Sequence, residues 1–194
     1  MIIMEKENSK KNKITVKDIT LVGLMAAMVF VASWLSIPIP TAIGNTRIHL
    51  GNVLCLLSGF LIGPAGGGLS AGIGSALYDL TNPAYVTSAP FTFLFKFAMG
   101  AVCGWIAYTG GRKASSHRWN LTGAVAGNVT YMILYLAKSF IQSMMLGNAP
   151  EAALIALGTK AVTSTVNAVI AVAVSVPLYA AIRLALKKSG LGNA

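Results

Sequence analysis

The chain has 194 residues, of which 55% are hydrophobic and only 10% are charged, and its mean hydropathy is +0.70. Soluble domains carry about 25% charged residues to cover a surface in water, so this composition excludes a soluble enzyme and predicts a protein surrounded largely by lipid. The net charge of +10 comes from clusters between apolar stretches, whereas a nucleic-acid-binding protein would gather its charge on one face with interleaved aromatic residues.

The first residues, 1–15, are polar and lysine-rich, and we expect a disordered basic tail there. The rest of the chain, 16–188, is predicted to form one membrane domain, followed by a short tail at 189–194. Proline- and glycine-containing breakers divide it into six apolar spans: 16–35, 49–62, 65–80, 91–110, 120–146 and 152–186. The second span is shorter than the about 20 residues of a full crossing, so it must tilt or be shielded by its neighbours. The predicted fold is an all-α, six-helix transmembrane bundle.

The basic residues predict the orientation of this bundle. If the N-terminal tail is cytoplasmic, the clusters at 6–17, 112–118 and 183–188 all fall on the cytoplasmic side, as the positive-inside rule requires. The loops on the other side then contain Arg47 as their only lysine or arginine. Both termini are therefore predicted to be cytoplasmic.

Several ionisable residues interrupt the apolar spans, and all map to the outer half of the membrane in this topology: Arg47, His49, Asp79, Lys96, Lys138 and Lys160. A lysine or aspartate in hydrocarbon costs on the order of 3 kcal/mol unless it is paired or hydrated. Their convergence predicts an outward-facing polar cavity. The alternative is that Asp79 pairs with Arg47 or Lys96, while the remaining lysines extend to the membrane surface.

The fifth span carries a polar stripe at intervals of three and four residues, which places its members on one helical face: Asn128, Tyr131, Tyr135, Lys138 and Gln142. The sixth span has a shorter stripe that contains Lys160, Thr163, Ser164 and Asn167. Such stripes face protein or water rather than lipid. They fit hydrogen bonding between helices, but the two lysines favour a ligand pocket. The short turn between the spans predicts that Lys138 and Lys160 lie at similar depth. Two like charges at one depth repel each other unless water or an anion lies between them, so we hypothesise that they flank an acidic group of the ligand.

Sequence signatures of catalysis and of metal binding are missing. There is no nucleotide-binding GxxxxGK[ST], no HExxH and no GxSxG. Cys55 and Cys103 are isolated in apolar sequence. No pair of neighbouring carboxylates is present to run acid–base chemistry, since Asp79 stands alone in the interior of the spans. We therefore expect no catalytic residue, no metal site and no cofactor, and any energy for active transport must come from a partner or an ion gradient.

Four segments together resemble the S component of energy-coupling factor (ECF) vitamin transporters; they are 47–52, 61–68, 72–79 and 90–91, which read RIHLGN, LIGPAGGG, GIGSALYD and PF. The resemblance implies a six-helix subunit of a prokaryotic-type plasma membrane that captures a vitamin or related micronutrient from outside. It also implies partners, namely a transmembrane coupling subunit and two ATPase subunits. In the family an Ala-x-x-x-Ala face of the first helix contacts the coupling subunit, and Gly23 with Ala27 is the nearest match here.

The resemblance and the polar stripes together give the candidate substrate-binding residues: Arg47, Asn82, Lys96, Tyr131, Tyr135, Lys138, Lys160 and Asn167. Four cationic side chains against Asp79 favour a ligand with a carboxylate or phosphate, such as pantothenate, over a neutral flavin or a cationic thiamine. The substrate itself stays open. Two other functions stay open as well: a free-standing secondary transporter or channel, which would need Asp79 as its coupling site, and a polytopic membrane enzyme, which the shortage of carboxylates and histidines disfavours.

Overall fold

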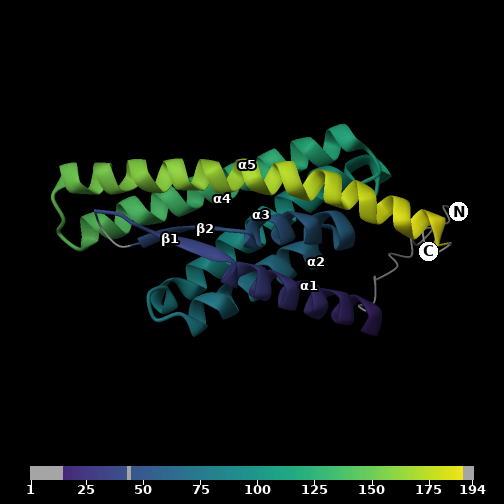
Figure 1. Ribbon diagram of the computed structural model, residues 1–194, viewed down its shortest axis with the longest axis horizontal. Coiled ribbons are helices and arrows are strands. Elements are labelled where there is room, and N and C mark those ends of the chain that lie inside the picture. The colour runs from purple at the N-terminus through teal and green to yellow at the C-terminus, as the bar shows by residue number, and fades with distance from the viewer. Residues whose placement is uncertain (1–14, 43–44, 190–194) are drawn as a thin grey trace, which may run out of the picture.

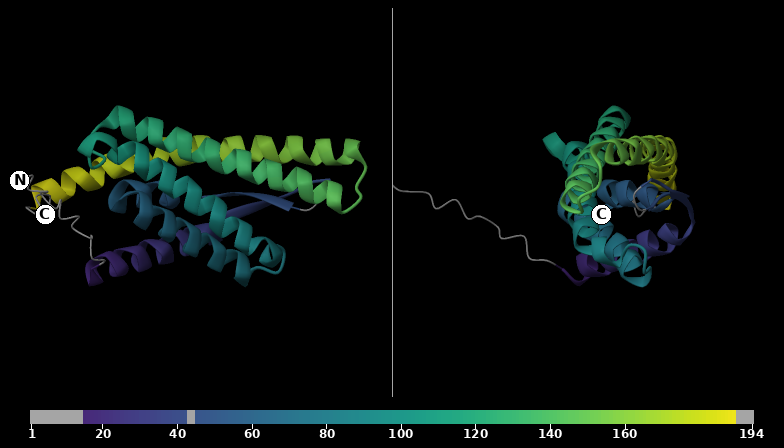
Figure 2. Two further views of the ribbon diagram at one scale, coloured as in Figure 1. Left: turned by 180° about the vertical axis from the view of Figure 1, so that it is seen from behind. Right: turned by 90° about the vertical axis from the view of Figure 1, so that its left-hand side faces the viewer.

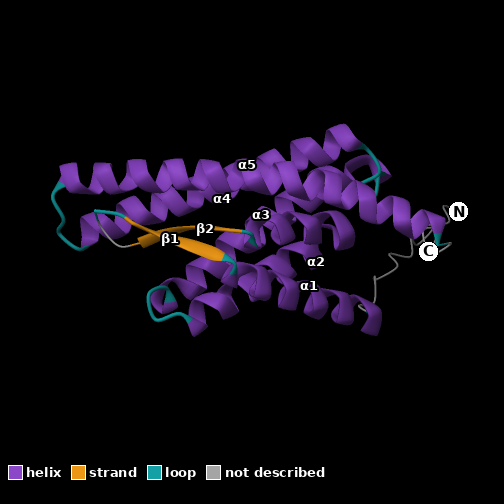
Figure 3. Cartoon of the chain, viewed as in Figure 1, coloured by secondary structure: helices purple, strands orange, loops and turns teal. Residues whose placement is uncertain are grey.

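The computed structural model describes residues 15–42 and 45–189. Five helices form most of this part of the chain: α1 (Val16–Trp34), α2 (Gly51–Thr81), α3 (Ala89–Tyr108), α4 (His117–Met145) and α5 (Pro150–Lys188). Each is long and apolar enough to cross a membrane, with α3 counted together with the short 3₁₀ turns at its two ends. Figure 3 shows how little of the described chain lies outside them. The predicted all-helical membrane architecture is confirmed.

The helix count differs from the six spans that the sequence predicts, because residues 51–81 form one bent element, α2. Gly63 has φ 76° and ψ −170°, a conformation that glycine adopts without steric cost. The segments on its two sides fold against each other, since Cys55 Sγ lies 3.7 Å from Ser75 Oγ. In a straight helix these residues would be about 30 Å apart. The break predicted at Gly63 and Pro64 is confirmed: two helical segments meet there at a sharp turn within α2.

One correction concerns the segment after α1, which the sequence predicts as a breaker and a loop. It forms a two-stranded antiparallel sheet of β1 (Ser36–Pro40) and β2 (Asn45–His49), in which Pro38 lies opposite Arg47. Proline is tolerated in an edge strand, where its missing N–H is not needed for pairing. Figures 1 and 2 show this hairpin between the α4–α5 pair and the lower helices.

Glycine allows the central helices to approach closely. A Cβ atom added at Gly100 of α3 would lie 2.6 Å from the carbonyl oxygen of Gly67 in α2, and one added at Gly127 of α4 would lie 2.6 Å from that of Met99. No real Cβ tolerates such distances, so these backbones pack in direct contact. The closely packed α2, α3 and α4 give the site a rigid base.

The two ends of the molecule differ in character. The start of α1 and the end of α5 lie at one end, and the hairpin and the α4–α5 turn lie at the other (Figure 1). Large apolar side chains on the outer faces are exposed, among them Trp105, Ile133, Val162 and Val169. Such exposure fits a surface that contacts lipid.

Candidate functional site

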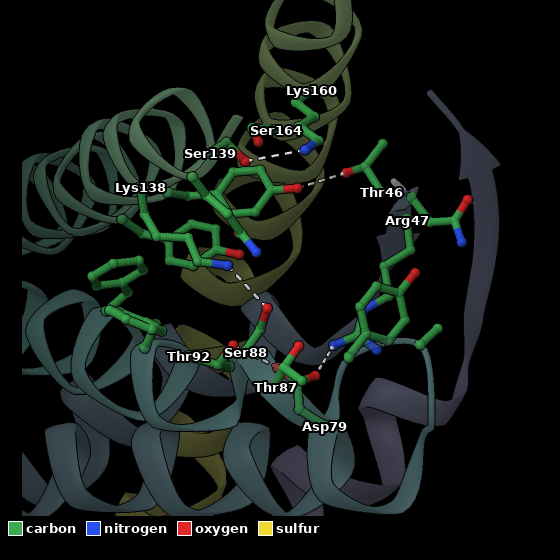
Figure 4. Close-up of a pocket in the computed structure, with 18 of the residues that line it drawn as sticks. Thr46, Arg47, Asp79, Thr87, Ser88, Thr92, Lys138, Ser139, Lys160 and Ser164 are labelled. Carbon is green, nitrogen blue, oxygen red and sulfur yellow. Dashed lines mark hydrogen bonds and ion pairs between the residues drawn. The ribbon is translucent and has the colours of Figure 1, made fainter. Parts of the chain in front are cut away.

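An open cavity of about 300 Å³ lies at the hairpin end of the molecule, enclosed by β2 and by parts of α2, α3, α4 and α5. The structure brings together there seven of the eight predicted substrate-binding residues: Arg47, Lys96, Tyr131, Tyr135, Lys138, Lys160 and Asn167. They come from four separate elements, and Figure 4 shows the labelled lysines and Arg47 converging on one space. The predicted polar cavity is therefore present.

The carboxylate of the cavity is already engaged. Asp79 at the end of α2 forms an ion pair with Arg47 of β2 at 3.0 Å, and it accepts a second hydrogen bond from the Thr92 hydroxyl of α3. The Arg47 guanidinium also lies over the rings of Tyr78 and Tyr85, at 3.9 and 4.7 Å from their centroids. Arg47 and Asp79 thus neutralise each other and fasten the hairpin to the helices, as one of the two interpretations of the sequence predicted for this pair.

Lys96 of α3 forms part of the inner wall of the cavity. Only 1% of its surface is exposed. Its ammonium donates to the side-chain oxygen of Asn52 and lies 3.6 Å from the centroid of the Tyr131 ring. A cation over an aromatic face is stabilised by the ring quadrupole, so Lys96 is held by one amide and one ring, with no carboxylate bound to it directly.

Lys138 of α4 and Lys160 of α5 lie nearer the mouth, and both are half-buried. The Lys138 ammonium donates to Ser88 Oγ at 3.0 Å, and the Lys160 ammonium donates to Ser139 Oγ at 3.2 Å (Figure 4). Neither has a carboxylate partner within the described residues, where Arg47 and Asp79 form the one ion pair. Each ammonium has three N–H donors, so both retain hydrogen-bonding capacity toward the cavity.

Asn167 of α5 holds the hairpin in place rather than presenting a free amide. Its oxygen accepts from the His49 backbone N–H at 3.0 Å, and its nitrogen donates to the Arg47 carbonyl at 2.8 Å. The Tyr135 hydroxyl donates to Thr46 Oγ1 at 3.3 Å. Helices α4 and α5 therefore hydrogen-bond to β2 from the cavity side and fix the position of Arg47.

His49 is a buried imidazole at the end of β2. Its Nδ1 accepts a hydrogen bond from the Gly51 N–H at 3.1 Å. Burial is the main reason that the pKa of His49 lies well below its usual range, and the charges of Lys96 and Arg47 lower it further. The ring is therefore neutral at physiological pH and adds no charge to the cavity.

Comparison with known proteins gives the family. The family described as "ECF-type riboflavin transporter, S component" matches residues 13–184. The chain belongs to this family. A solved structure titled "Structure and mechanism of the S component of a bacterial ECF transporter" superposes with a TM-score of 0.64 and 19% identity, covering 88% of this chain and 98% of the other. That likeness confirms the fold.

A curated relative in Pyrococcus woesei, described as "Uncharacterized protein in gap 3'region", is 30% identical over 105 residues. The match covers 54% of this S component and 66% of the relative, just under two thirds of its length. Membership in the family identifies the chain as an ECF-type S component. Within the described residues, no three His, Cys, Asp or Glu side chains gather as metal ligands.

Asn82 is the one predicted residue that the structure does not bring to the cavity of this S component. Its amide nitrogen donates to the Tyr78 hydroxyl at 3.2 Å, and its oxygen accepts from the Ala84 N–H at 3.1 Å. Asn82 therefore shapes the turn that follows α2.

Several lining residues lie outside the polar stripes and outside the segments that carry the resemblance, among them Thr46, Tyr85, Ser88 and Ser139. Most belong to segments that were predicted as loops or loop ends. Ser139 follows Lys138 directly and lies off the polar stripe. The pair of polar residues Thr87 and Ser88, shortly before Pro90, was the sequence feature that could have indicated Ser88 as a lining residue. The aromatic wall was predicted in part, because Tyr131 and Tyr135 belong to the polar stripe. In the structure their ring centroids are 5.8 Å apart and their planes differ by 9°.

The face of α1 that carries Gly23 and Ala27 points away from the bundle. Both residues are exposed, and a Cβ added at Gly23 would meet no atom within 4 Å. Leu24 and Val31 on the same side are 56% and 62% exposed. The two small residues therefore do not serve packing inside this chain.

Proposed function

We propose that this S component captures a small vitamin-like molecule with an acidic group from the outer side of the plasma membrane. The module that accepts it would consist of a transmembrane coupling subunit and two ATPase subunits, with the exposed Gly23–Ala27 face of α1 as the contact with the coupling subunit. In this proposal both termini are cytoplasmic and the cavity opens outward, and the doubled-back α2 provides six crossings. Support comes from Arg112, Lys113 and Arg118, which follow α3 on the side where α5 ends.

The observation that carries the acidic substrate is the pair of lysines at the mouth, Lys138 and Lys160. They come from adjacent antiparallel helices, and each is bound to a serine hydroxyl rather than a carboxylate. Two like charges in one wall repel each other unless water or an anion lies between them. A carboxylate or phosphate between the two ammonium groups would relieve that repulsion and accept charge-assisted hydrogen bonds. Pantothenate is a test ligand of this kind.

Riboflavin is the second candidate, and two observations favour it. The matching family is described by riboflavin, and the cavity offers aromatic surfaces, namely the stacked Tyr131 and Tyr135 together with Phe91 and Phe95. A flat ring system gains from stacking on such faces. Riboflavin binding would make use of the aromatic wall and leave the two lysines without an anionic partner.

Native mass spectrometry of the gently purified chain, followed by calorimetric titration with pantothenate and with riboflavin, distinguishes these candidates. The proposal expects a retained acidic molecule and saturable pantothenate binding that is weakened by Lys138→Met. If the chain instead binds riboflavin, and Lys138→Met leaves that affinity unchanged, the proposal of an acidic substrate is wrong. The proposed role in transport would still stand. Co-purification of two ATPases and a coupling subunit from native membranes tests the partner proposal separately, because substrate uptake by the chain alone in liposomes would contradict it.

A further inference from the structure

A second cavity, of about 350 Å³, lies at the opposite end of the molecule, between the start of α4 and the end of α5. We call it the basal groove. Its lining combines basic side chains, His117, Arg183 and Lys187, with apolar ones, Val176, Ala180 and Leu184. Leu184 is 55% exposed. The groove therefore offers positive charge and apolar surface side by side at an end of the transmembrane helices.

The polar groups of the basal groove keep unused hydrogen-bonding capacity. Arg183 donates through Nη1 to the Ser115 carbonyl at 2.7 Å, which positions the guanidinium and leaves its other N–H groups available. Asn120 is 4% exposed and donates to the Ala114 carbonyl at 2.8 Å, but its side-chain oxygen has no partner in the described part of the chain. The groove thus combines free cationic donors with one buried, unpartnered acceptor.

No acidic side chain in the described part of the chain compensates the charge around the basal groove. Of the three acidic residues that the structure describes, Asp79 belongs to the other cavity, Glu151 begins α5 at the far end, and Asp18 caps the start of α1 by bonding to Thr15. None of the three lines the groove. An anion is the complementary occupant.

The position of the groove at one end of the membrane-spanning helices favours a lipid over a soluble anion. Arg112 stacks on the ring of Trp119 in the first turn of α4, with the guanidinium carbon 4.0 Å from the ring centroid. Tryptophan and arginine gather where the headgroups begin. A free phosphate would use Arg183 and Lys187 but would leave the apolar half of the groove without a partner.

We propose that the basal groove binds the headgroup of an acidic phospholipid. The phosphate lies against Arg183 and Lys187, a headgroup hydroxyl donates to the Asn120 oxygen, and the first methylene groups of an acyl chain pack on Val176 and Leu184. Basic pockets between helices at a membrane surface bind anionic headgroups by this combination of charge and apolar contact. The lipid would bridge α4 and α5 at the end opposite the substrate cavity.

Native mass spectrometry of the full chain in detergent, with phosphatidylglycerol and phosphatidylcholine at equal concentration, tests the proposal. The wild type should retain phosphatidylglycerol in preference. Arg183→Gln and Lys187→Gln should each reduce that preference about fivefold, the effect of one cation near an anionic headgroup. Arg118→Gln is the matched control, since Arg118 is an exposed cation of the first turn of α4 that lies outside the groove; it should retain the full preference.

The Lys187 side chain makes no hydrogen bond in the described part of the chain, so Lys187→Gln should fold even if Arg183→Gln does not. Arg183→Lys should restore most of the lipid preference. Equal retention of the two lipids by the wild type would overturn the proposal. An unchanged preference in Lys187→Gln would overturn it as well. Displacement of phosphatidylglycerol by millimolar inorganic phosphate would assign the groove to a soluble anion and refute the lipid.

Discussion

Replacing Lys138 or Lys160 by methionine tests the cationic mouth most directly. Methionine keeps an unbranched apolar stem and removes the charge. Each ammonium makes a single hydrogen bond to a serine hydroxyl and no ion pair, so the variant loses one charge-assisted hydrogen bond to an acidic ligand, or about 1.5–3 kcal/mol. This loss corresponds to a roughly 10- to 150-fold higher Kd.

The double variant adds a geometric test. If both lysines contact the same acidic group, the loss in Lys138→Met/Lys160→Met should differ from the sum of the two single losses, because residues with a shared partner couple. Calorimetry on the purified chain measures all three variants against the ligand that the wild type retains. Lys17→Met, an exposed cation in the first turn of α1, is the control and should bind like the wild type. Unchanged affinity in both single variants would refute the argument and return the lysines to a structural role.

Three further predictions concern the fold, the partner and pH. Arg47→Met should lower the free energy of unfolding by about 3 kcal/mol in thermal melts, because it leaves the buried Asp79 unpaired, and Asp79→Asn in addition should recover part of the loss. Gly23→Leu should reduce uptake in cells that express the whole transporter but leave ligand binding intact. Gly100→Leu is the contrasting variant and should prevent folding, because its Cβ meets the α2 backbone. Loss of ligand binding in Gly23→Leu would contradict the proposed partner interface. Because the pKa of His49 is lowered by burial, the unfolded state takes up the proton first, and stability should fall as the pH drops below about 6.5. An equal fall in His49→Gln would exclude this residue as the cause.

Local sequence patterns determined the helices and the cationic side chains of the cavity wall. The apolar spans follow directly from composition, and the prediction that the first span begins at Val16 agrees with the start of α1, where Thr15 and Asp18 form a capping box. The stripe of Tyr131, Tyr135 and Lys138 was readable because helical periodicity fixes which residues of one helix share a face. Charge in apolar sequence then marked the polar cavity, since such residues require protein or water around them.

Tertiary structure decided which partner each of these residues has. The sequence left Asp79 a choice between Arg47 and Lys96, and the fold pairs it with Arg47 because the β1–β2 hairpin brings that guanidinium over the end of α2. The hairpin itself was not predicted, because the prolines of β1 are typical of a break between helices. Only the pairing with β2 in the folded chain shows that this segment is a strand. In the same way Asn167 was expected to face a ligand, but both ends of its amide are bonded to β2. Periodicity is a property of one helix and can be read along the chain, whereas a hydrogen-bond partner is set by the packing of elements far apart in sequence.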